Sequence, residues 1–213
     1  MAQRSYRGRT VEERQSERRD RFMSAALDVF GTSGYDRGTV SAICAAAKLS
    51  RRQFYELFDT REDLLIAAYD MIHGEARSAV LEAFADVDAE AGIEERTRAA
   101  VGAFFDSVAT DPRRMRIAFV EVGGVSSRVE GHRVQARGQW TEFFSAAAAE
   151  FTGLSESEFG FTYEAAAFIG ALTEAGRLWA SSSQHRPDRD TVVEMLVGII
   201  LSFAAGRSTP NDL

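Results

Sequence analysis

The sequence contains few of the residues that cross-link, kink or anchor a polypeptide. Its 213 residues include one cysteine, Cys44, and three prolines. A single thiol forms neither an internal disulfide nor a multi-cysteine metal site, which is typical of a protein in the reducing cytoplasm. The chain has no run of about 18 apolar residues, so we expect no membrane-spanning helix and no membrane partner. The arginine-rich N-terminus lacks the apolar stretch of a secretory signal, and we therefore predict a cytoplasmic protein.

Residue patterns typical of catalytic and metal-binding sites are also missing. The three histidines, His73, His132 and His185, have no histidine, cysteine or aspartate partner at the spacing of metal ligands. The sequence contains no G-x-S-x-G motif, no phosphate-binding Walker loop and no dinucleotide-binding fingerprint. Cys44 falls on the apolar side of a short predicted helix, where we expect a small buried side chain; a redox-sensing thiol is the alternative. We therefore expect no enzyme activity, no metal and no cofactor.

Charge is distributed unevenly along the chain. The net charge is −7, which taken alone argues against binding to nucleic acid. Residues 1–62, however, contain 12 Lys or Arg and 9 Asp or Glu, a net charge of +3, whereas the remaining 13 and 23 give −10. Arginine provides every cation except Lys48, and its forked guanidinium suits paired contacts with phosphates and bases. A basic N-terminal region on an acidic body is the arrangement expected when only one end of a protein meets DNA.

Apolar residues recur at helical spacing throughout the chain, and we predict an all-α protein. Its N-terminal part is predicted to be a three-helix helix-turn-helix domain, because the N-cap residues Thr39, Ser50 and Thr60 follow one another closely. Ser50 with Gln53, and Thr60 with Asp63, have the spacing of a capping box. The predicted helices of this domain span about 18–33, 40–46 and 51–58.

The C-terminal part of the chain is predicted to form a larger helical domain. Asp111 followed by Pro112 marks one helix start, and a joint rich in glycine and serine occupies 123–131. Ser155 and Glu158 give a further capping-box signal. The predicted helices cover about 62–88, 93–109, 112–123, 130–152, 157–182 and 188–206.

Four short motifs in the N-terminal part occur in a fixed register. They are A-x-x-x-F-x-x-x-G-Y from Ala26, T-V-x-x-I from Thr39, S-x-x-x-F-Y-x-x-F from Ser50 and E-D-L-L from Glu62. The stretch 21–65 that contains them resembles the DNA-binding domain of the tetracycline-repressor (TetR) family. The resemblance implies a transcriptional regulator that binds a palindromic operator in double-stranded DNA. A purely structural helical cluster with solvated charges is the alternative.

The resemblance places a recognition helix at about 51–57 in the major groove of DNA. Arginine and glutamine side chains in its first turn suit guanine and adenine edges, whereas hydroxyl and guanidinium groups around it suit phosphates. Base contacts are thereby expected from Arg51, Arg52 and Gln53, and phosphate contacts from Thr39, Tyr55 and Arg61, with Ser50 at the helix start.

Three positions depart from the family pattern. Arg52 stands where a small residue or proline is frequent, so the base preference of relatives does not carry over. Glu56 faces outward near phosphate, where it should repel DNA unless it accepts from a cytosine or pairs with Arg52. Lys48 occupies a turn position where glycine is common, which adds a basic group and some backbone strain.

The N-terminal segment has two interpretations. Residues 6–9, Tyr-Arg-Gly-Arg, resemble an arginine clamp that enters an A·T-rich minor groove. A basic tail that adds affinity without reading sequence is the alternative, and we favour it.

Aromatic and methionine side chains are concentrated in the middle predicted helices. Any single residue in such a stripe is expected to belong to the hydrophobic core. Members of the TetR family, however, usually hold a small-molecule effector among these helices. The resemblance therefore implies an apolar pocket with a few polar groups that orient the ligand. The candidate ligand-binding residues are Phe104, Phe105, Met115, Phe119, Glu121, Trp140, Phe144, Phe168 and Trp179, with Arg133, Gln139, Tyr163 and Glu174 as further polar candidates.

The last two predicted helices favour a homodimer. Small residues keep the helix at 157–182 slim, and the helix at 188–206 is apolar nearly all round between Val192 and Phe203. A helix of this kind is buried on two sides, so we predict that a twofold partner covers one of them in a four-helix seam. Burial within a monomer is the alternative.

Together these features predict a repressor that a small apolar or amphipathic ligand releases from DNA. The helix that starts at Thr60 is the expected lever, since it joins the DNA-binding helices to the ligand domain. A small-molecule carrier with the same helical body, an activator and a regulator without a ligand are the alternatives. The expected division is a flexible arginine-bearing arm (1–17), a helix-turn-helix domain (18–62), a ligand-binding and dimerisation domain (63–206) and a frayed tail (207–213).

Overall fold

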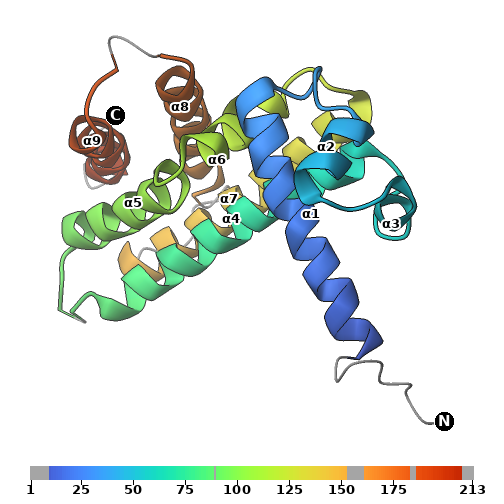
Figure 1. Cartoon of the computed structure of the whole chain (residues 1–213). Coiled ribbons are helices and arrows are strands. Elements are labelled where there is room, and N and C mark those ends of the chain that lie inside the picture. Colours follow the sequence, from blue (N-terminus) through green and yellow to red (C-terminus); the bar gives the residue numbers. More distant parts are fainter. Residues whose placement is uncertain (1–9, 89, 153–160, 183–185, 208–213) are drawn as a thin grey trace.

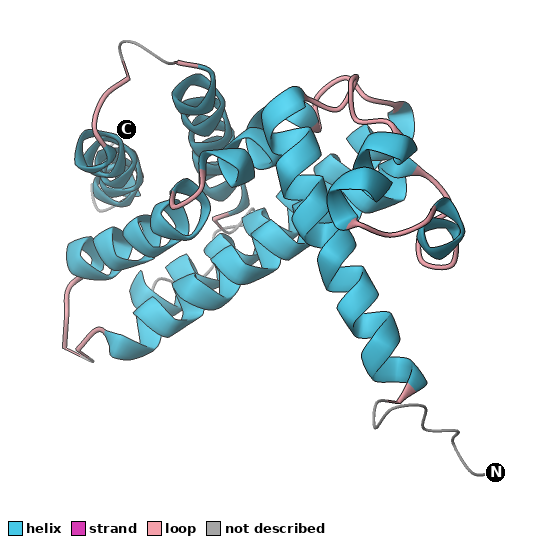
Figure 2. Cartoon of the chain, in the orientation of Figure 1, coloured by secondary structure: helices cyan, strands magenta, loops and turns pink. Residues whose placement is uncertain are grey.

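The structure is a computed structural model that describes residues 10–88, 90–152, 161–182 and 186–207. Within these ranges every regular element is a helix, which confirms the predicted all-α fold (Figure 2). In chain order the elements are α1 (Val11–Ser33), α2 (Val40–Ala47), α3 (Arg51–Tyr55), α4 (Arg61–Asp86), α5 (Ile93–Ala109), α6 (Pro112–Arg116), the π-helical turn η1 (Ile117–Glu121), α7 (Ser127–Thr152), α8 (Thr162–Ser181) and α9 (Arg189–Arg207).

Side-chain caps set where the helices of the N-terminal part begin. Thr39 Oγ1 accepts from a backbone N–H in the first turn of α2. Before α3, Ser50 Oγ accepts from the N–H of Gln53 while Gln53 Oε1 accepts from that of Ser50. Thr60 and Asp63 form the same reciprocal pair before α4. These caps satisfy N–H groups that have no partner inside a helix, and they confirm the three predicted starts.

The first helix begins much earlier than predicted. Thr10 Oγ1 accepts from Glu13 N at 3.0 Å and Glu13 Oε2 accepts from Thr10 N at 2.7 Å, a capping box that starts α1 at Val11 rather than near residue 18. The prediction of a flexible arm is therefore wrong for residues 11–17. Figure 1 shows the start of α1 projecting beyond the other helices. A helical segment without neighbours to pack against needs no apolar stripe, and the prediction of the helix start depended on such a stripe. The Tyr-Arg-Gly-Arg segment at 6–9 lies outside the described residues.

Four further helix predictions differ from the structure. α7 begins at Ser127 rather than near 130, so the predicted joint rich in glycine and serine at 123–131 is shorter. α3 ends at Tyr55 rather than 58, and a turn follows it. The segment predicted as one helix over 112–123 divides into α6 and the π-helical turn η1. α8 begins at Thr162 rather than 157. The capping signal at Ser155 lies outside the described residues.

An aromatic cluster holds the N-terminal helices together. Phe22 of α1 and Phe54 of α3 are fully buried, and their rings meet edge to face with centroids 5.4 Å apart. Phe58 lies 6.1 Å from Phe22, and Ile43 of α2 is fully buried as well. Complete burial of one such side chain is worth about 1.5–3 kcal/mol relative to exposure, so these few residues fix how α3 sits against α1.

One long helix connects this cluster to the rest of the molecule. We call α1–α3 and the first two turns of α4 the head, and the remainder the body. Leu64 and Leu65 of α4 are fully buried in the head, and Ile72 and Val80 are fully buried in the body. Figure 1 shows α4 and α5 side by side, with α7, α8 and α9 completing the body. α4 has 26 residues and is therefore about 39 Å long at 1.5 Å per residue.

The head meets the body where α1 passes α6. A Cβ built on Gly31 would lie 2.4 Å from Cβ of Arg113 and 2.8 Å from its Cα, so the two helices approach backbone to backbone. Arg113 also forms ion pairs with Asp28 of α1 and with Asp111. Beside this contact α1 ends at Gly34, whose φ of 87° is strained for any L side chain.

Two glycine-to-alanine variants are predicted to have opposite effects. Gly31→Ala should lower the free energy of unfolding by about 1–3 kcal/mol, because its methyl group has no room against the backbone of Arg113. Gly74→Ala should raise it by about 0.5–1 kcal/mol, since Gly74 lies inside α4 and a Cβ there would meet nothing. Urea denaturation followed by circular dichroism measures both. Wild-type stability of Gly31→Ala would contradict this account of the junction.

Candidate functional site

The first turn of α3 forms an exposed cationic surface on the head. Phe54 is fully buried, and its burial orients α3 so that Arg51, Arg52 and Tyr55 point away from the core. Tyr55 is 55% exposed, which places an apolar ring with a hydroxyl donor on a basic surface. The structure thus brings together, on one side of a short capped helix, three of the residues predicted to contact DNA.

Partners within the chain restrict what two of the predicted base-reading residues can contact. Arg51 donates to Ser41 Oγ of α2, which joins the two helices. Gln53 Oε1 accepts from Ser50 N at 2.9 Å and from the Ser50 hydroxyl, so this oxygen is engaged in the cap. A bidentate contact with adenine needs both the oxygen and the nitrogen of the amide. While the cap persists, Gln53 has only its NH₂ group available to contact a base. The bidentate contact with adenine that its residue type predicts is then not available.

Two arginines neutralise Glu56 beside this surface. Its carboxylate accepts from Arg18 Nη1 at 2.8 Å and from Arg52 Nε at 3.3 Å. The pairing with Arg52 was one of the two expectations for this position. The pairing with Arg18 was not predicted, because the two residues are 38 positions apart and no local pattern relates them. Glu56 therefore carries no unpaired charge on the surface of α3.

Arg61 is held in the corner between α1 and α2. Its Nη1 donates to the carbonyl oxygens of Tyr35 at 3.0 Å and Gly38 at 3.4 Å, and its guanidinium lies 4.1 Å from the centre of the Tyr35 ring. These contacts give Arg61 a structural role that sequence reasoning missed, and its contact with phosphate stays a prediction. Thr39 is exposed; its oxygen caps α2, and its hydroxyl proton is left for another acceptor.

The turn between α2 and α3 confirms the strain predicted at Lys48. This residue has φ 53° and ψ 43°, in the left-handed region, where a non-glycine residue costs about 1–2 kcal/mol. Arg21 of α1 stabilises the turn by donating to the carbonyl oxygens of Ala47 and Lys48 at 2.5 and 2.8 Å. The side chain of Lys48 is exposed and adds a further cation to the head.

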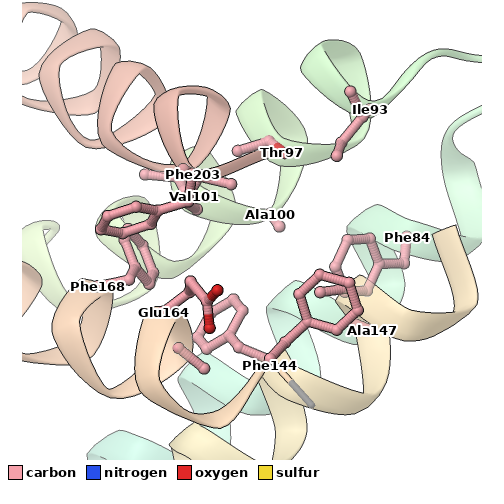
Figure 3. A pocket seen from close by; sticks show the side chains of 14 residues that line it. Phe84, Ile93, Thr97, Ala100, Val101, Phe144, Ala147, Glu164, Phe168 and Phe203 are labelled. Carbon is pink, nitrogen blue, oxygen red and sulfur yellow. The ribbon is translucent and has the colours of Figure 1, made fainter. Parts of the chain in front are cut away.

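A cavity of about 100 Å³ lies in the body among α4, α5, α7, α8 and α9 (Figure 3). Phe144 and Phe168 were predicted to bind a ligand, and both line it. Glu164 was not predicted, because a glutamate in the first turn of a helix also suits the helix dipole. Figure 3 shows its carboxylate among the aromatic side chains. The wall consists of Phe84, Ile93, Thr97, Ala100, Val101, Phe144, Ala147, Ala148, Phe161, Glu164, Ala165, Phe168, Ile200 and Phe203.

A smaller cavity, of about 20 Å³, lies among α4, α5, α7, α8 and η1. It has room for a group about the size of a water molecule. Phe104, Phe119 and Trp140, all predicted to bind a ligand, line this cavity, and so does Arg133, one of the polar candidates. The other polar candidates, Gln139, Tyr163 and Glu174, are exposed and line neither cavity.

Four of the predicted ligand-binding residues line neither cavity. Phe105 and Trp179 meet edge to face at 5.3 Å in the core, and Met115 is fully buried. Glu121 lies at the junction of head and body. Aromatic and methionine side chains at helical spacing form packed core as readily as a cavity wall, and a ligand contact of these four residues stays a prediction.

Glu121 joins the body to the head. Its Oε2 accepts from the backbone N–H of Tyr35 at 2.6 Å, and its Oε1 accepts from Arg116 Nε at 2.6 Å. Arg116 in turn donates to the carbonyl oxygen of Thr32 at 2.7 Å. The turn η1, which ends at Glu121, is thereby tied to the C-terminal end of α1.

His73 lines the smaller cavity and is held in one tautomer. Trp140 Nε1 can only donate, and it lies 3.0 Å from His73 Nδ1, so that nitrogen accepts and Nε2 carries the proton. His73 Nε2 is buried and has no hydrogen-bond partner among the described residues. Burial, with smaller contributions from Arg77 and His132, lowers the pKa of His73 to about 4. Sequence analysis assigned His73 no role, because one histidine on a helix gives no spacing signal.

The low pKa of His73 predicts that stability depends on pH. Between its folded pKa of about 4 and its ordinary value of 6.5, the unfolded chain binds a proton that the folded chain does not. The contribution of neutral His73 to the free energy of unfolding is therefore complete above pH 6.5. It is lost as the pH falls towards 4, by up to about 3 kcal/mol at 1.36 kcal/mol per pKa unit. Urea denaturation of the wild type and of His73→Phe at pH 7.5 and 5 measures it. An equal loss of stability in both proteins would contradict the assignment.

The last helix packs mainly against its own chain. Val192, Val193, Leu196 and Val197 are buried in the core of the body, and Ile200 and Phe203 line the larger cavity. This limits the predicted partner-facing surface to the opposite side of α9, where Met195 is 49% exposed. The outer face of α8 likewise exposes Tyr163, Ala166, Ala167, Gly170 and Leu178. A partner on these faces stays a prediction.

Other site types find little support in the described part of the chain. None of its helices is long and apolar enough to cross a membrane. No group of three or more His, Cys, Asp or Glu side chains among the described residues could hold a metal ion. Cys44 is buried, as predicted, and burial raises the pKa of its thiol.

A comparison with protein families matches the head of this chain. Residues 22–68 match the model of the bacterial regulatory proteins, tetR family. The match runs from α1 through α2 and α3 into α4, and it therefore contains the whole exposed surface of α3. No curated protein matches the sequence.

Solved structures resemble the chain over most of its length. The fatty acid degradation regulator FadR from Bacillus halodurans is 18% identical, with a TM-score of 0.74 over 86% of this chain and 94% of that one. A TetR-family transcriptional regulator from Syntrophomonas wolfei is 19% identical, with a TM-score of 0.76 over 92% and 99%. FadR from Bacillus subtilis, in complex with stearoyl-CoA, is 16% identical, with a TM-score of 0.71 over 86% and 97%. At these identities the likeness shows the fold.

Proposed function

We propose that this chain is a member of the tetR family of bacterial regulatory proteins, whose model its head matches, and that it is a repressor that an apolar or amphipathic ligand releases from DNA. The observation that carries the proposal is the surface of α3. Burial of Phe54 and the cap at Ser50 hold this short helix rigidly, and its exposed first turn presents Arg51 and Arg52. A rigid helix that offers guanidinium groups from its first turn suits the major groove of DNA.

The residues of the head divide into two groups by the DNA atoms they suit. Arg51 and Arg52 suit guanine edges, where a good bidentate contact gives about 1–3 kcal/mol of discrimination. Tyr55 and Thr39 keep hydroxyl donors for phosphate oxygens, which position the head without reading sequence. Gln53 contributes only its NH₂ group, because its amide oxygen is engaged in the cap. Lys48 adds charge, which strengthens binding to any DNA and makes it depend on salt.

A palindromic operator requires two copies of the head, and we propose that α8 and α9 supply the contact between them. Their outer faces carry the half-exposed Leu178 and Met195 together with small residues such as Gly170. Small residues permit close approach of a second pair of helices, and a twofold axis makes the same faces meet. In such a dimer the recognition helices must lie about 34–36 Å apart to enter successive major grooves.

Ligand control is proposed to act through α4. Leu64 and Leu65 anchor this helix in the head core, while Phe84 near its other end lines the larger cavity. That cavity, at about 100 Å³, is smaller than the roughly 300–1,000 Å³ typical of ligand sites, so a ligand has to widen it. Widening moves α4 and changes the separation of the two heads. A hundredfold loss of DNA affinity requires about 2.7 kcal/mol of coupling.

The nature of the ligand follows from the cavity wall. Alanine, isoleucine, valine and phenylalanine side chains make up most of it, which favours a ligand with an apolar part. FadR from Bacillus subtilis, which shares the fold, is in complex with stearoyl-CoA, an amphipathic molecule. We propose no catalytic role for any residue. A carrier protein would have no use for the exposed arginines of α3, which argues against that alternative.

Substitutions on α3 should separate base reading from phosphate binding. Arg51→Ala is expected to weaken operator binding by about 1–3 kcal/mol and to relax the preference at one base pair. Tyr55→Phe is expected to weaken binding to operator and to unrelated DNA alike, because it removes a phosphate contact. Fluorescence anisotropy with DNA from just upstream of the protein's own gene, and with a scrambled duplex, measures both. Unchanged base preference in Arg51→Ala and Arg52→Ala would refute base reading by these residues, and no binding to the upstream DNA would count against the proposed function.

The proposed dimer predicts a specific effect of charge on the outer face of α9. Met195→Arg should give monomers, because a guanidinium would be buried without a partner in the seam. Leu81→Arg is the matched control: Leu81 is 51% exposed on α4, against 49% for Met195, and should leave the dimer intact. Leu196 is unsuitable for this test, since it is fully buried within its own chain. Sedimentation velocity at micromolar concentration decides, and a monomeric wild type would contradict the proposal.

A further inference from the structure

The smaller cavity of the body has a wall rich in hydrogen-bond donors. Tyr69, His73, Arg133 and Arg137 bring hydroxyl, imidazole and guanidinium groups to it. No aspartate or glutamate is among the described residues that line it, and the hydroxyl of Thr173 already donates to the carbonyl oxygen of Ile169 at 2.6 Å. Such a wall suits a ligand that brings acceptor oxygen atoms.

One of these donors, His73 Nε2, lacks an acceptor among the described residues. The hydrogen bond from Trp140 leaves the proton of His73 on Nε2, which is buried and has no partner among the described residues. Buried N–H groups without an acceptor are rare, because water or a ligand normally satisfies them. Tyr69 is buried, and its hydroxyl is a second donor at the cavity. Burial raises the pKa of Tyr69 to about 12, so this hydroxyl keeps its proton at neutral pH.

Charge around the cavity favours an anion. The groups that act on Tyr69 and His73 include three guanidinium groups and two carboxylates, namely Arg77, Arg133, Arg137, Asp70 and Glu130. Glu130 pairs with Arg133 and lies 3.8 Å from Arg137, and Asp70 lies 2.6 Å from His132. The two guanidinium groups that line the cavity, Arg133 and Arg137, therefore share one carboxylate, and each retains further N–H donors.

We propose that the smaller cavity binds a carboxylate group of the effector, with His73 Nε2–H as the central donor and Arg133 and Arg137 as the counter-charges. The inference rests on the proposed function and adds the chemical class of the ligand: an organic acid with an apolar chain. The carboxylate supplies the acceptor that His73 lacks and a second negative charge for Arg133 and Arg137, which share Glu130.

The apolar part of such an acid has a place in the neighbouring larger cavity. A continuous series of aromatic rings separates the two cavities: Phe104 meets Trp140 at 5.3 Å, Trp140 stacks on Phe144 at 5.7 Å, and Phe144 meets Phe168 at 5.3 Å. Phe104 and Trp140 line the smaller cavity, whereas Phe144 and Phe168 line the larger. One ligand can therefore span both when these rings turn.

Occupancy of the smaller cavity also acts on the elements that join head and body. At about 20 Å³ the cavity holds a water-sized group, so a carboxylate has to displace part of the wall. Phe119 of η1 cannot withdraw towards α8, because a Cβ on Gly176 would already lie 2.9 Å from its ring. The displacement falls on α4, which carries Tyr69 and His73, and on η1, which ends at Glu121.

Three probes with the same eight-carbon chain test the proposal: octanoate, octanamide and octan-1-ol. Trp179→Phe leaves Trp140 as the single tryptophan, and its fluorescence reports on the smaller cavity. Octanoate is expected to bind at least about tenfold more tightly than octan-1-ol, since hydrogen bonds to charged groups are the stronger class. In the wild type, nitrogen NMR is expected to show His73 as the Nε2–H tautomer, with a shift of that resonance on adding octanoate.

Variants identify the groups responsible. Arg137→Gln should remove most of the preference for octanoate without loss of octan-1-ol binding, whereas Arg177→Gln, on the exposed face of α8, should leave the preference intact. His73→Phe should also abolish the preference; if it does not fold, the NMR measurement on the wild type takes its place. Equal affinity for the three probes, no binding of any at millimolar concentration, or an unshifted His73 resonance would overturn the carboxylate site.

The same probes separate this inference from the proposed function. Release of operator DNA by octan-1-ol as effectively as by octanoate would leave a ligand-controlled repressor without a carboxylate site. Binding of octanoate at His73 with unchanged DNA affinity would support the site and refute control of DNA binding by that ligand.

Discussion

The structure depends on α4 being buried at both ends in different surroundings. Leu64 and Leu65 pack in the core of the head, whereas Ile72 and Val80 pack in that of the body. Because both cores hold the same rigid helix, neither can be rearranged without a response in the other. This single constraint is the physical basis of the proposed coupling between the small cavity beside the middle of α4 and the exposed helix α3 of the head.

The head and the junction are stabilised by different kinds of interaction. The head is kept rigid by aromatic contacts such as Phe22 on Phe54, which leave little freedom to the arginines of α3. The junction uses directional hydrogen bonds instead, above all those of Glu121 to Tyr35 and Arg116. Such bonds break over a short displacement, whereas an apolar contact weakens gradually. A rigid head on a polar junction suits a molecule in which orientation of the head, rather than its internal structure, is regulated.

The fold and the head could be predicted from sequence, and the ligand site only in part. Caps such as Ser50 with Gln53 are local signals, so they identified helix starts correctly. The cap at Thr10 was overlooked because the helix behind it projects from the core and has no apolar stripe. Phe104 lines a cavity and Phe105 does not, although the two are neighbours in the chain, because a cavity depends on distant helices. His73 acquires its role from Trp140, 67 residues away, which no local pattern reveals.

The π-helical geometry of η1 bears directly on how the body is linked to the head. A π-helical turn holds an extra residue compared with an α-helix, and such turns are concentrated at functional positions. Each residue of an α-helix turns the chain by about 100° and advances it by 1.5 Å. A change of register by one residue in Ile117–Glu121 would therefore swing the Glu121 carboxylate away from Tyr35 entirely. The hydrogen bond that links body to head at Glu121 therefore depends on the register of this turn.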